Sequence, residues 1–153
     1  MQWEWMPARA ALPLAAHLVT ARRGYTHHGI YVGNGNVVHY PGLVRGRWGT
    51  PVEEVSLAAF ARGRGLWVRP HVSPRFDRHA IVARARSRIG ENCYRILSNN
   101  CEHFCEWCVR GESRSAQVER LLAAPRRALR TIVSWIGRTA GAGSMSFSAS
   151  ARK

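Results

Sequence analysis

Two kinds of residue are scarce in this chain: lysine and the acidic residues. Lys153 is the only lysine, and nine Asp and Glu residues stand against 23 Lys and Arg, which gives a formal net charge of +14. The arginine excess fits either a compositional bias of the genome or a surface that meets anionic lipid or nucleic acid. Of these partners we expect a membrane surface and not nucleic acid.

Long apolar runs and dispersed cysteines are also lacking. The apolar stretch 10–16 is interrupted by Pro13 and followed by His17, so we expect no signal peptide, and no run is long enough to span a bilayer. Three of the four cysteines fall within residues 101–108, which does not fit a disulfide framework in a secreted domain. We therefore expect a bacterial-type cytoplasmic protein, with peripheral attachment to a membrane as an option.

The length of 153 residues fits one domain with a tail. We expect a catalytic domain over residues 1–111, a basic amphipathic helical extension over 112–138 and a disordered tail over 139–153. In the extension, Leu129 and Ile136 mark an apolar face, with arginines largely elsewhere. Such a helix can lie in a membrane interface or pack on the domain, and the sequence leaves both options open.

The first half of the chain has the pattern of an antiparallel sheet. Aromatic and β-branched residues bounded by Gly, Pro and Asn predict strands. Capping residues and apolar stripes predict helices. The expected strands are 17–20, 25–32, 36–40 and 66–70. The expected helical segments are one turn capped by Ser56, a helix from Ser73-Pro74 to Gly90 and a segment over 113–119. The second of these has Asp77 in its first turn and an apolar stripe of Ile81, Ala85 and Ile89.

The hairpin formed by the second and third of these strands has two possible registers. A two-residue Asn34-Gly35 turn pairs residue 33 with 36 and places His39 opposite Ile30. A three-residue loop over 33–35 pairs residue 32 with 36 and places His39 opposite Gly29, diagonal to His27. The turn therefore decides which histidine lies beside His39.

The stretch 99–108 is the most informative part of the sequence. Asn99 and Asn100 are good helix caps and directly precede Cys101, so this cysteine should lie in the first turn of a helix that ends at Gly111. The positive end of a helix lowers the pKa of a thiol and favours the nucleophilic thiolate. Cys101 is therefore the candidate nucleophile.

The spacing of Cys101, Cys105 and Cys108 allows other interpretations. The pattern C-x3-C-x2-C occurs in iron–sulfur enzymes, and Cys105, Cys108 and His103 could bind zinc. On a continuous helix, however, the three cysteines form one stripe, which indicates that Cys105 and Cys108 are small packed side chains. We expect no metal and no cofactor.

A cysteine nucleophile needs a base beside it, and imidazole is the usual one. His27, His28 and His39 are the candidates on the predicted hairpin. His103 would point away around the helix, so we assign it a supporting role.

The motifs as a whole resemble the lecithin:retinol acyltransferase domain family. The residues that carry the resemblance are His27 to Gly33, Val37 to Tyr40 and Tyr94 to Phe104, and it extends over about 13–110. It implies an α+β, circularly permuted papain-like or NlpC-like fold, in which an antiparallel sheet packs on the helix that bears the cysteine. One departure is Ala15-Ala16-His17, where family members commonly have Gly-Asp.

The resemblance also implies roles for individual residues. Cys101 becomes the nucleophile, His27 the general base and acid, and His39 the group that orients His27, which selects the three-residue hairpin loop. We assign four further residues to substrate binding or to support of these three: Asn100, His103, Tyr31 and Tyr94.

The implied activity is thiol-dependent. The expected protein is a phospholipase A or acyltransferase that cleaves phospholipid acyl esters through a thioester on Cys101. The alternatives are an NlpC-like cysteine amidase or peptidase, and a non-catalytic module that binds membrane or nucleic acid. The sequence does not decide between hydrolysis and transfer, nor does it give the oligomeric state.

Overall fold

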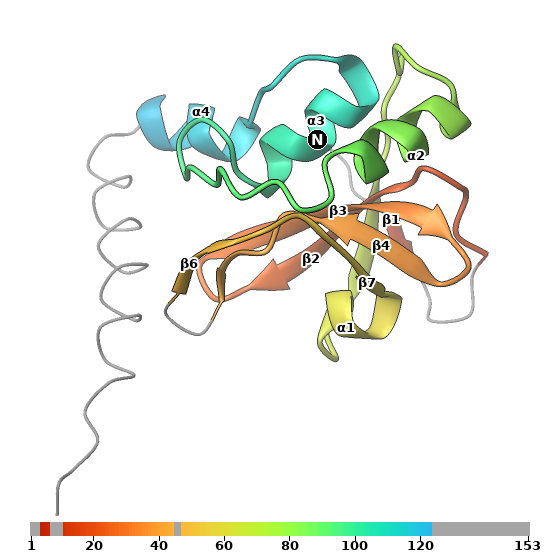
Figure 1. Cartoon of the computed structure of the whole chain (residues 1–153), viewed down its shortest axis with the longest axis horizontal. Coiled ribbons are helices and arrows are strands. Elements are labelled where there is room, and N and C mark those ends of the chain that lie inside the picture. The colour runs from red at the N-terminus through yellow and green to blue at the C-terminus, as the bar shows by residue number, and fades with distance from the viewer. Residues whose placement is uncertain (1–3, 7–10, 45–46, 124–153) are drawn as a thin grey trace, which may run out of the picture.

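A computed structural model describes residues 4–6, 11–44 and 47–123. These residues form an antiparallel sheet that has helices on both of its faces. The six strands of the main sheet follow the order β1-β8-β2-β3-β4-β7, and each neighbouring pair is antiparallel. Helices α2, α3 and α4 lie on one side of this sheet and α1 lies on the other (Figure 1). The strands are β1 Glu4–Met6, β2 His17–Arg22, β3 Tyr25–Gly33, β4 Asn36–His39, β5 Gly42–Val44, β6 Arg47–Thr50, β7 Glu53–Ser56 and β8 Leu66–Arg69, and the helices are α1 Leu57–Ala61, α2 Arg78–Ser87, α3 Cys101–Arg110 and α4 Ala116–Ala123.

The antiparallel sheet and the helix that begins at Cys101 confirm the predicted α+β class. Strands β2, β3, β4 and β8 lie where the sequence pattern placed them. Strands β5 and β6 form a separate two-stranded sheet.

The hairpin of β3 and β4 has the register that places His39 opposite Gly29. The predicted loop, however, is wrong. Gly33 pairs with Asn36 across a two-residue turn, in which Asn34 and Gly35 have φ values of 51° and 73°, and a bulge between Tyr31 and Gly33 shifts the register by one residue. Positive φ at both central residues is typical of a type I′ turn, and a bulge inserts the extra residue that the predicted loop was to provide.

Alternation along β3 and β4 divides the core into two halves. Ile30 and Val38 face α3 and pack with Phe104 in the larger hydrophobic cluster. Val37 faces α1 and packs with Phe60 in the smaller cluster. Since neighbouring strand residues point to opposite faces, His28 lies on the α3 side and His27 on the α1 side.

The helix boundaries follow their caps. Ser56 caps α1 and Gly111 ends α3 with φ of 77°, as predicted. Helix α2 begins later than predicted, because the Asp77 side chain accepts the N–H of Ala80 and makes Asp77 the N-cap. Ile89 is 47% exposed and does not continue the stripe of buried residues in α2.

Helix α4 begins at Ala116, later than the predicted start at residue 113, and the hydroxyl of Ser115 accepts the N–H of Val118 at 3.3 Å. The predicted apolar face around Leu129 and Ile136 and the predicted tail over 139–153 lie outside the described residues. The domain boundary at residue 111 stays a prediction.

Candidate active site

Asn100 and His103 together fix the start of α3. The side-chain oxygen of Asn100 accepts the N–H groups of Glu102 at 2.9 Å and His103 at 3.0 Å. In return, the N–H of Asn100 donates to Nδ1 of His103 at 3.4 Å, which closes a capping box. The residues that fix this helix start are neighbours in the sequence, and they place Cys101 at the first position of the helix.

The thiol of Cys101 lies at the edge of β3 beyond the end of β4. The β3·β4 ladder stops at the pair Gly29–His39, so the N–H of His28 is free to donate to the Cys101 sulfur. The N–H groups of Glu102 and of Cys101 itself also face the sulfur. The Tyr94 hydroxyl meets both the N–H and the thiol of Cys101. The sulfur is therefore surrounded by hydrogen-bonding groups from the helix start and the strand edge.

The expectation of a lowered thiol pKa is wrong for this structure. Cys101 is only 2% exposed, and this burial raises the pKa of its thiol to about 12, although the surrounding N–H groups act to lower it. Removal of the thiolate from water therefore raises the thiol pKa by more than the N–H groups at the helix start lower it. At neutral pH Cys101 is a thiol, and it needs a base that takes its proton during the reaction.

His27 and His39 form the predicted pair. Nε2 of His27 and Nδ1 of His39 are 2.8 Å apart, and both rings pack against Phe60, with ring centroids 5.3 and 5.5 Å from it. Nδ1 of His27 is buried and has no hydrogen-bond partner among the described residues. Nε2 of His39 also has no hydrogen bond among these residues, but it lies 3.4 Å from the Glu53 carboxylate, so Nδ1 of His27 is the nitrogen of the pair that is left to accept a proton.

Glu53 extends the histidine pair toward the surface. It lies opposite His39 in the β4·β7 ladder, and its carboxylate is 3.4 Å from Nε2 of His39. If His39 directs Nε2–H toward Glu53, its Nδ1 accepts Nε2–H of His27, and Nδ1 of His27 keeps its lone pair. This tautomer assignment, made from the contacts, gives His27 the form of a general base.

Burial keeps both imidazoles neutral. It lowers the pKa of His27 well below 6.5, and the neighbouring His39 and Arg22 lower it further. Burial and the nearby Arg62 and Arg22 lower the pKa of His39 to about 3. The resting site therefore holds a neutral thiol and neutral histidines.

Tyr25 and Arg22 interact with both the Cys101 thiol and the histidine pair. The Tyr25 ring is 6.5 Å from the His27 ring, and burial, with a smaller effect of the nearby Cys101, raises the pKa of the Tyr25 hydroxyl. Arg22 and Tyr25, with Arg62, also line a cavity of about 20 Å³ at His27 and His39. Arg22 and Tyr25 line a second, larger pocket of about 340 Å³ on the other side, which also contains Arg120.

The predicted supporting residues differ in their positions. Asn100, His103 and Tyr94 contact the start of α3 or Cys101 itself. Tyr31 does not join them: its hydroxyl accepts the N–H of Gly35 in the hairpin turn. Along a strand that rises about 3.3 Å per residue, it lies roughly 13 Å from His27.

Sequence reasoning missed Glu53, Tyr25, Arg22 and Arg62. Tyr25 and Arg22 flank the predicted turn before β3, so their closeness to His27 could have been inferred from the hairpin. Glu53 and Arg62 gave no such signal, because their positions depend on the pairing of β7 with β4 and on the turn after α1.

The neighbouring cysteines are packing residues. Cys105 and Cys108 are fully buried in the larger hydrophobic cluster, and burial raises the pKa of both thiols. His103, the third member of the zinc site considered from the sequence, is engaged in the capping box.

A second polar network lies on the α3 side of the sheet. Glu102 accepts hydrogen bonds from Arg69 at 2.6 Å, from Ser115 at 2.6 Å and from the N–H of Gln117 at 3.0 Å. Burial opposes its charge, but His28 and these hydrogen bonds hold the pKa of the carboxyl below its usual range. The network ties the segment before α4 to the start of α3.

The chain is an α+β protein that has a cysteine at a helix start and a histidine pair on an antiparallel sheet, the two kinds of group that a thiol–imidazole site requires. Residues 10–114 match the lecithin retinol acyltransferase family, and the chain belongs to this family. The resemblance inferred from the motifs is thus confirmed.

Three relatives show how far the similarity extends. The chain is 26% identical over 133 residues to lecithin retinol acyltransferase of Rattus norvegicus, an alignment that covers 67% of this chain and 56% of the relative. It is 32% identical over 114 residues to phospholipase A and acyltransferase 2 of Homo sapiens, covering 64% of this chain and 70% of that protein. For phospholipase A and acyltransferase 4 of Homo sapiens, the identity is 29% over 115 residues, with 65% and 70% covered. The chain thus spans little more than half the length of the rat relative.

Within the described residues, every helix is too short or too polar to cross a bilayer.

Proposed function

We propose that this chain is a thiol-dependent acyltransferase or hydrolase that acts on phospholipid acyl esters through a thioester on Cys101. The observation that carries the proposal is the buried Nδ1 of His27, which has no hydrogen-bond partner in the described part of the chain, on an imidazole that His39 contacts at 2.8 Å. The names of the two human relatives support phospholipid as the acyl donor. We propose with it that the fold is the circularly permuted papain-like or NlpC-like one.

In the first step, Nδ1 of His27 takes the thiol proton of Cys101 while the sulfur attacks the ester carbonyl. Because the thiol pKa is raised, proton transfer accompanies the attack and does not precede it. His39 accepts Nε2–H of the imidazolium that forms, and the Glu53 carboxylate stabilises the positive charge through His39.

The oxyanion needs donors that are not already used. Asn100 occupies the N–H groups of Glu102 and His103, so those two are unavailable to substrate. The N–H of Cys101 faces the Tyr94 hydroxyl, a group that can itself donate. We therefore assign the oxyanion to the N–H of Cys101 together with Tyr94.

In the second step, His27 protonates the leaving lysolipid oxygen, and the acyl group remains on the Cys101 sulfur. Water or an acceptor alcohol or amine then gives a proton to His27 and attacks the thioester, which releases a fatty acid or an acylated acceptor and restores the thiol. The pocket of about 340 Å³ that reaches Tyr25 is the proposed entry, and Arg22 and Arg120 on its wall suit an anionic head group.

The test is acylation of the protein by phospholipid vesicles, followed by mass spectrometry of the Cys101 peptide. We expect an acyl adduct on Cys101 and release of fatty acid or acylated acceptor. Cys101→Ala should abolish both, whereas Cys93→Ala, at an exposed cysteine, should retain them. Equal release by wild type and Cys101→Ala would refute the thioester mechanism, and cleavage of amide substrates alone would favour an amidase.

A further inference from the structure

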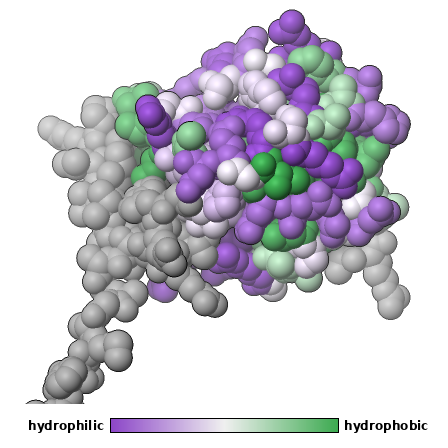
Figure 2. Space-filling model, in the orientation of Figure 1, coloured by the Kyte–Doolittle hydropathy of each residue, from purple (hydrophilic) through white to green (hydrophobic). Residues whose placement is uncertain are grey.

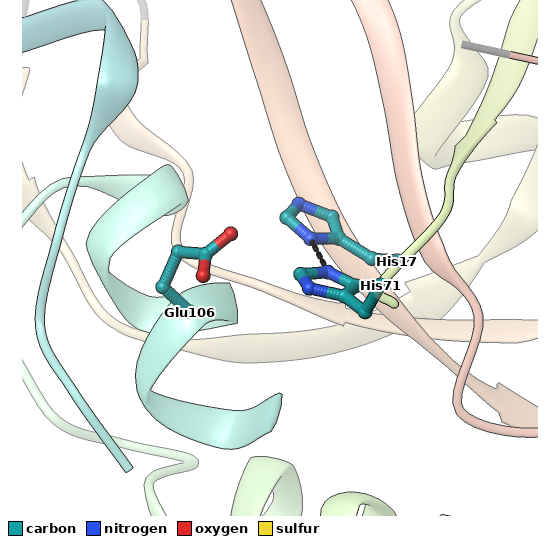
Figure 3. A group of neighbouring side chains, drawn as sticks. All are labelled: His17, His71 and Glu106. Carbon is teal, nitrogen blue, oxygen red and sulfur yellow. Dashed lines mark hydrogen bonds between the residues drawn. The ribbon is translucent and has the colours of Figure 1, made fainter. Parts of the chain in front are cut away.

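Three side chains that the thiol chemistry does not use come together beside α3. His17 begins β2, His71 follows β8, and Glu106 lies in the middle of α3. Their ligand atoms all lie within 4.8 Å of one another. Figure 3 shows the two imidazoles side by side, with the Glu106 carboxylate extending from α3 toward them. Two nitrogens and one carboxylate oxygen are a ligand set that zinc takes in proteins.

The spacing of these atoms is close to that of a coordination site. Nδ1 of His17 and Nε2 of His71 are 2.9 Å apart. Two ligands at about 2.0–2.1 Å from a tetrahedral zinc lie about 3.3–3.4 Å apart. Small rotations of the side chains therefore suffice to open the histidine pair and to bring the carboxylate into position.

Glu106 provides a second, independent observation. Its Oε1 is buried and has no hydrogen-bond partner among the described residues. Arg69 lies 3.1 Å away as an ion pair, but another nitrogen of the same guanidinium donates to Glu102 at 2.6 Å. Arg69 can therefore keep Glu102 as its partner when Glu106 turns to a cation.

Two positive charges act against the site. Arg69 is one, and Arg110 lies 3.6 Å from the other oxygen of Glu106. Both compete with a cation for the carboxylate, so the affinity should be lower than that of a closed structural zinc site.

Coordination at Nδ1 of His17 requires Nε2 of His17 to carry the proton and to donate it to His28. Nε2 of His17 is 2.8 Å from Nδ1 of His28, and in the tautomer in which His28 accepts this N–H, Nε2–H of His28 can donate to the Thr26 hydroxyl at 3.0 Å. The amide nitrogen of Gln117, which can only donate, then bonds to the Thr26 carbonyl and Glu102 and not to His28. Metal-binding histidines commonly donate their second N–H to such an acceptor, which fixes the tautomer and the ring orientation.

We propose that His17, His71 and Glu106 bind a divalent transition metal of the zinc type, with a fourth position open to solvent. That position faces a pocket of about 280 Å³, whose wall includes His71, Glu106 and Arg110. Binding joins the start of β2, the segment after β8 and α3, and it stabilises the folded chain. The proposal does not depend on the thiol activity.

The experiment uses the full chain after treatment with a chelator. Titration with Zn²⁺ followed by calorimetry, and with Co²⁺ followed by visible absorption, should show one metal per chain and a rise in the unfolding temperature with Zn²⁺. His71→Ala should lower the affinity at least about tenfold, and Glu106→Gln should also weaken binding. His79→Ala, at an exposed histidine of α2, is the matched control and should bind as wild type does.

The variants must first unfold at the wild-type temperature without metal, and His71→Gln replaces His71→Ala if the latter does not. Absence of binding by wild type would overturn the proposal. Equal affinity in wild type and the His71 variant would do the same, as would a cobalt spectrum with sulfur-to-metal charge transfer, which would assign the metal to a cysteine.

Discussion

Cys101 and His27 are both buried, and burial moves their pKa values in opposite directions. The thiol pKa is raised to about 12, and the imidazole pKa falls well below 6.5, because each group loses the water that stabilises its charged form. A thiolate–imidazolium pair is therefore not the resting state. In the proposed mechanism, charge appears only when the substrate is attacked, and Glu53 and His39 stabilise it.

The raised thiol pKa predicts slow alkylation at neutral pH. In a Cys93→Ser background, which removes the exposed cysteine, the rate at which iodoacetamide labels Cys101 should rise about tenfold per pH unit from pH 7 to 9, because only the thiolate reacts. Peptide mass spectrometry measures the labelled fraction at Cys101. A plateau of the rate below pH 8 would show instead a preformed thiolate.

The contact of Glu53 with His39 predicts a modest but specific catalytic effect. Because the Glu53 side chain is 45% exposed, Glu53→Gln should lower kcat by roughly threefold to tenfold with little change in KM. The adjacent Glu54 points to Asn36 and Arg86, so Glu54→Gln is a matched control that should keep kcat. A loss of kcat in both variants would indicate damage to β7 and not a role of Glu53 in the histidine pair.

At the scale of elements, the hairpin of β3 and β4 decides which histidines meet. The bulge between Tyr31 and Gly33 shifts β4 by one residue, and His39 then lies opposite Gly29, on the face of His27. Gly29 leaves room on that face for Phe60, which packs on both imidazoles.

Adding one methyl group at Gly29 should disturb this packing. The new Cβ would lie 2.6 Å from Cγ1 of Val37 and 2.8 Å from Cε2 of Phe60. Gly29→Ala should therefore lower the free energy of unfolding by about 1–3 kcal/mol. It should also reduce activity, because Phe60 must move against His27 and His39. Urea unfolding measures the first effect and phospholipid turnover the second.

Gly35→Asn is the control for this prediction. Gly35 has φ of +73°, and no atom would lie within 4 Å of its Cβ. Asparagine adopts this region more readily than most residues, so the free energy of unfolding should change by less than about 1 kcal/mol. Wild-type stability in Gly29→Ala would show that the sheet absorbs the methyl group without strain.

At the scale of the molecule, the described surface offers a membrane more charged side chains than apolar area. The face in Figure 2 is largely hydrophilic among the described residues, and hydrophobic residues form separate groups on it. The exposed large apolar side chains, Val72, Ile89, Leu97 and Leu122, come from different segments. Attraction of the described domain to an anionic bilayer would therefore depend on arginines, each adding about 1 kcal/mol near the surface.

The buried histidines make the stability of the whole fold depend on pH. Between pH 7 and 5 the unfolded chain binds protons at His27 and His39 that the folded chain does not, since their folded pKa values are lowered. Stability therefore falls as the pH falls below about 6.5, by at most about 1.4 kcal/mol per pH unit for each histidine. Glu102, whose folded pKa is also lowered, loses its contribution only below about pH 4.5.

Urea unfolding between pH 7 and 5 tests this dependence. His39→Gln should remove about one proton from the uptake on unfolding at pH 5.5, and the slope of stability against pH should become smaller. His79→Gln, at an exposed position, should leave the slope unchanged. An equal slope in His39→Gln and wild type would mean that His39 is protonated in the folded protein.

The sequence by itself determined the features that depend on near neighbours in the chain. Asn100 caps the helix of Cys101, Ser56 caps α1, and a turn within residues 33–36 joins the strands of His27 and His39, although the bulge that makes it a two-residue turn was not predicted. These are backbone hydrogen bonds and dihedral preferences within a few residues, so the residue types alone predict them, and the family motifs lie on the same segments.

Only the tertiary structure decided the surroundings of these residues. The burial of Cys101, which reverses its expected pKa shift, depends on how α3 packs against the edge of β3. The contact of Glu53 with His39 depends on strand pairing, and the group of His17, His71 and Glu106 joins three segments far apart in the chain. Desolvation and long-range contacts have no local signal, because they arise only when the whole sheet and its helices have assembled.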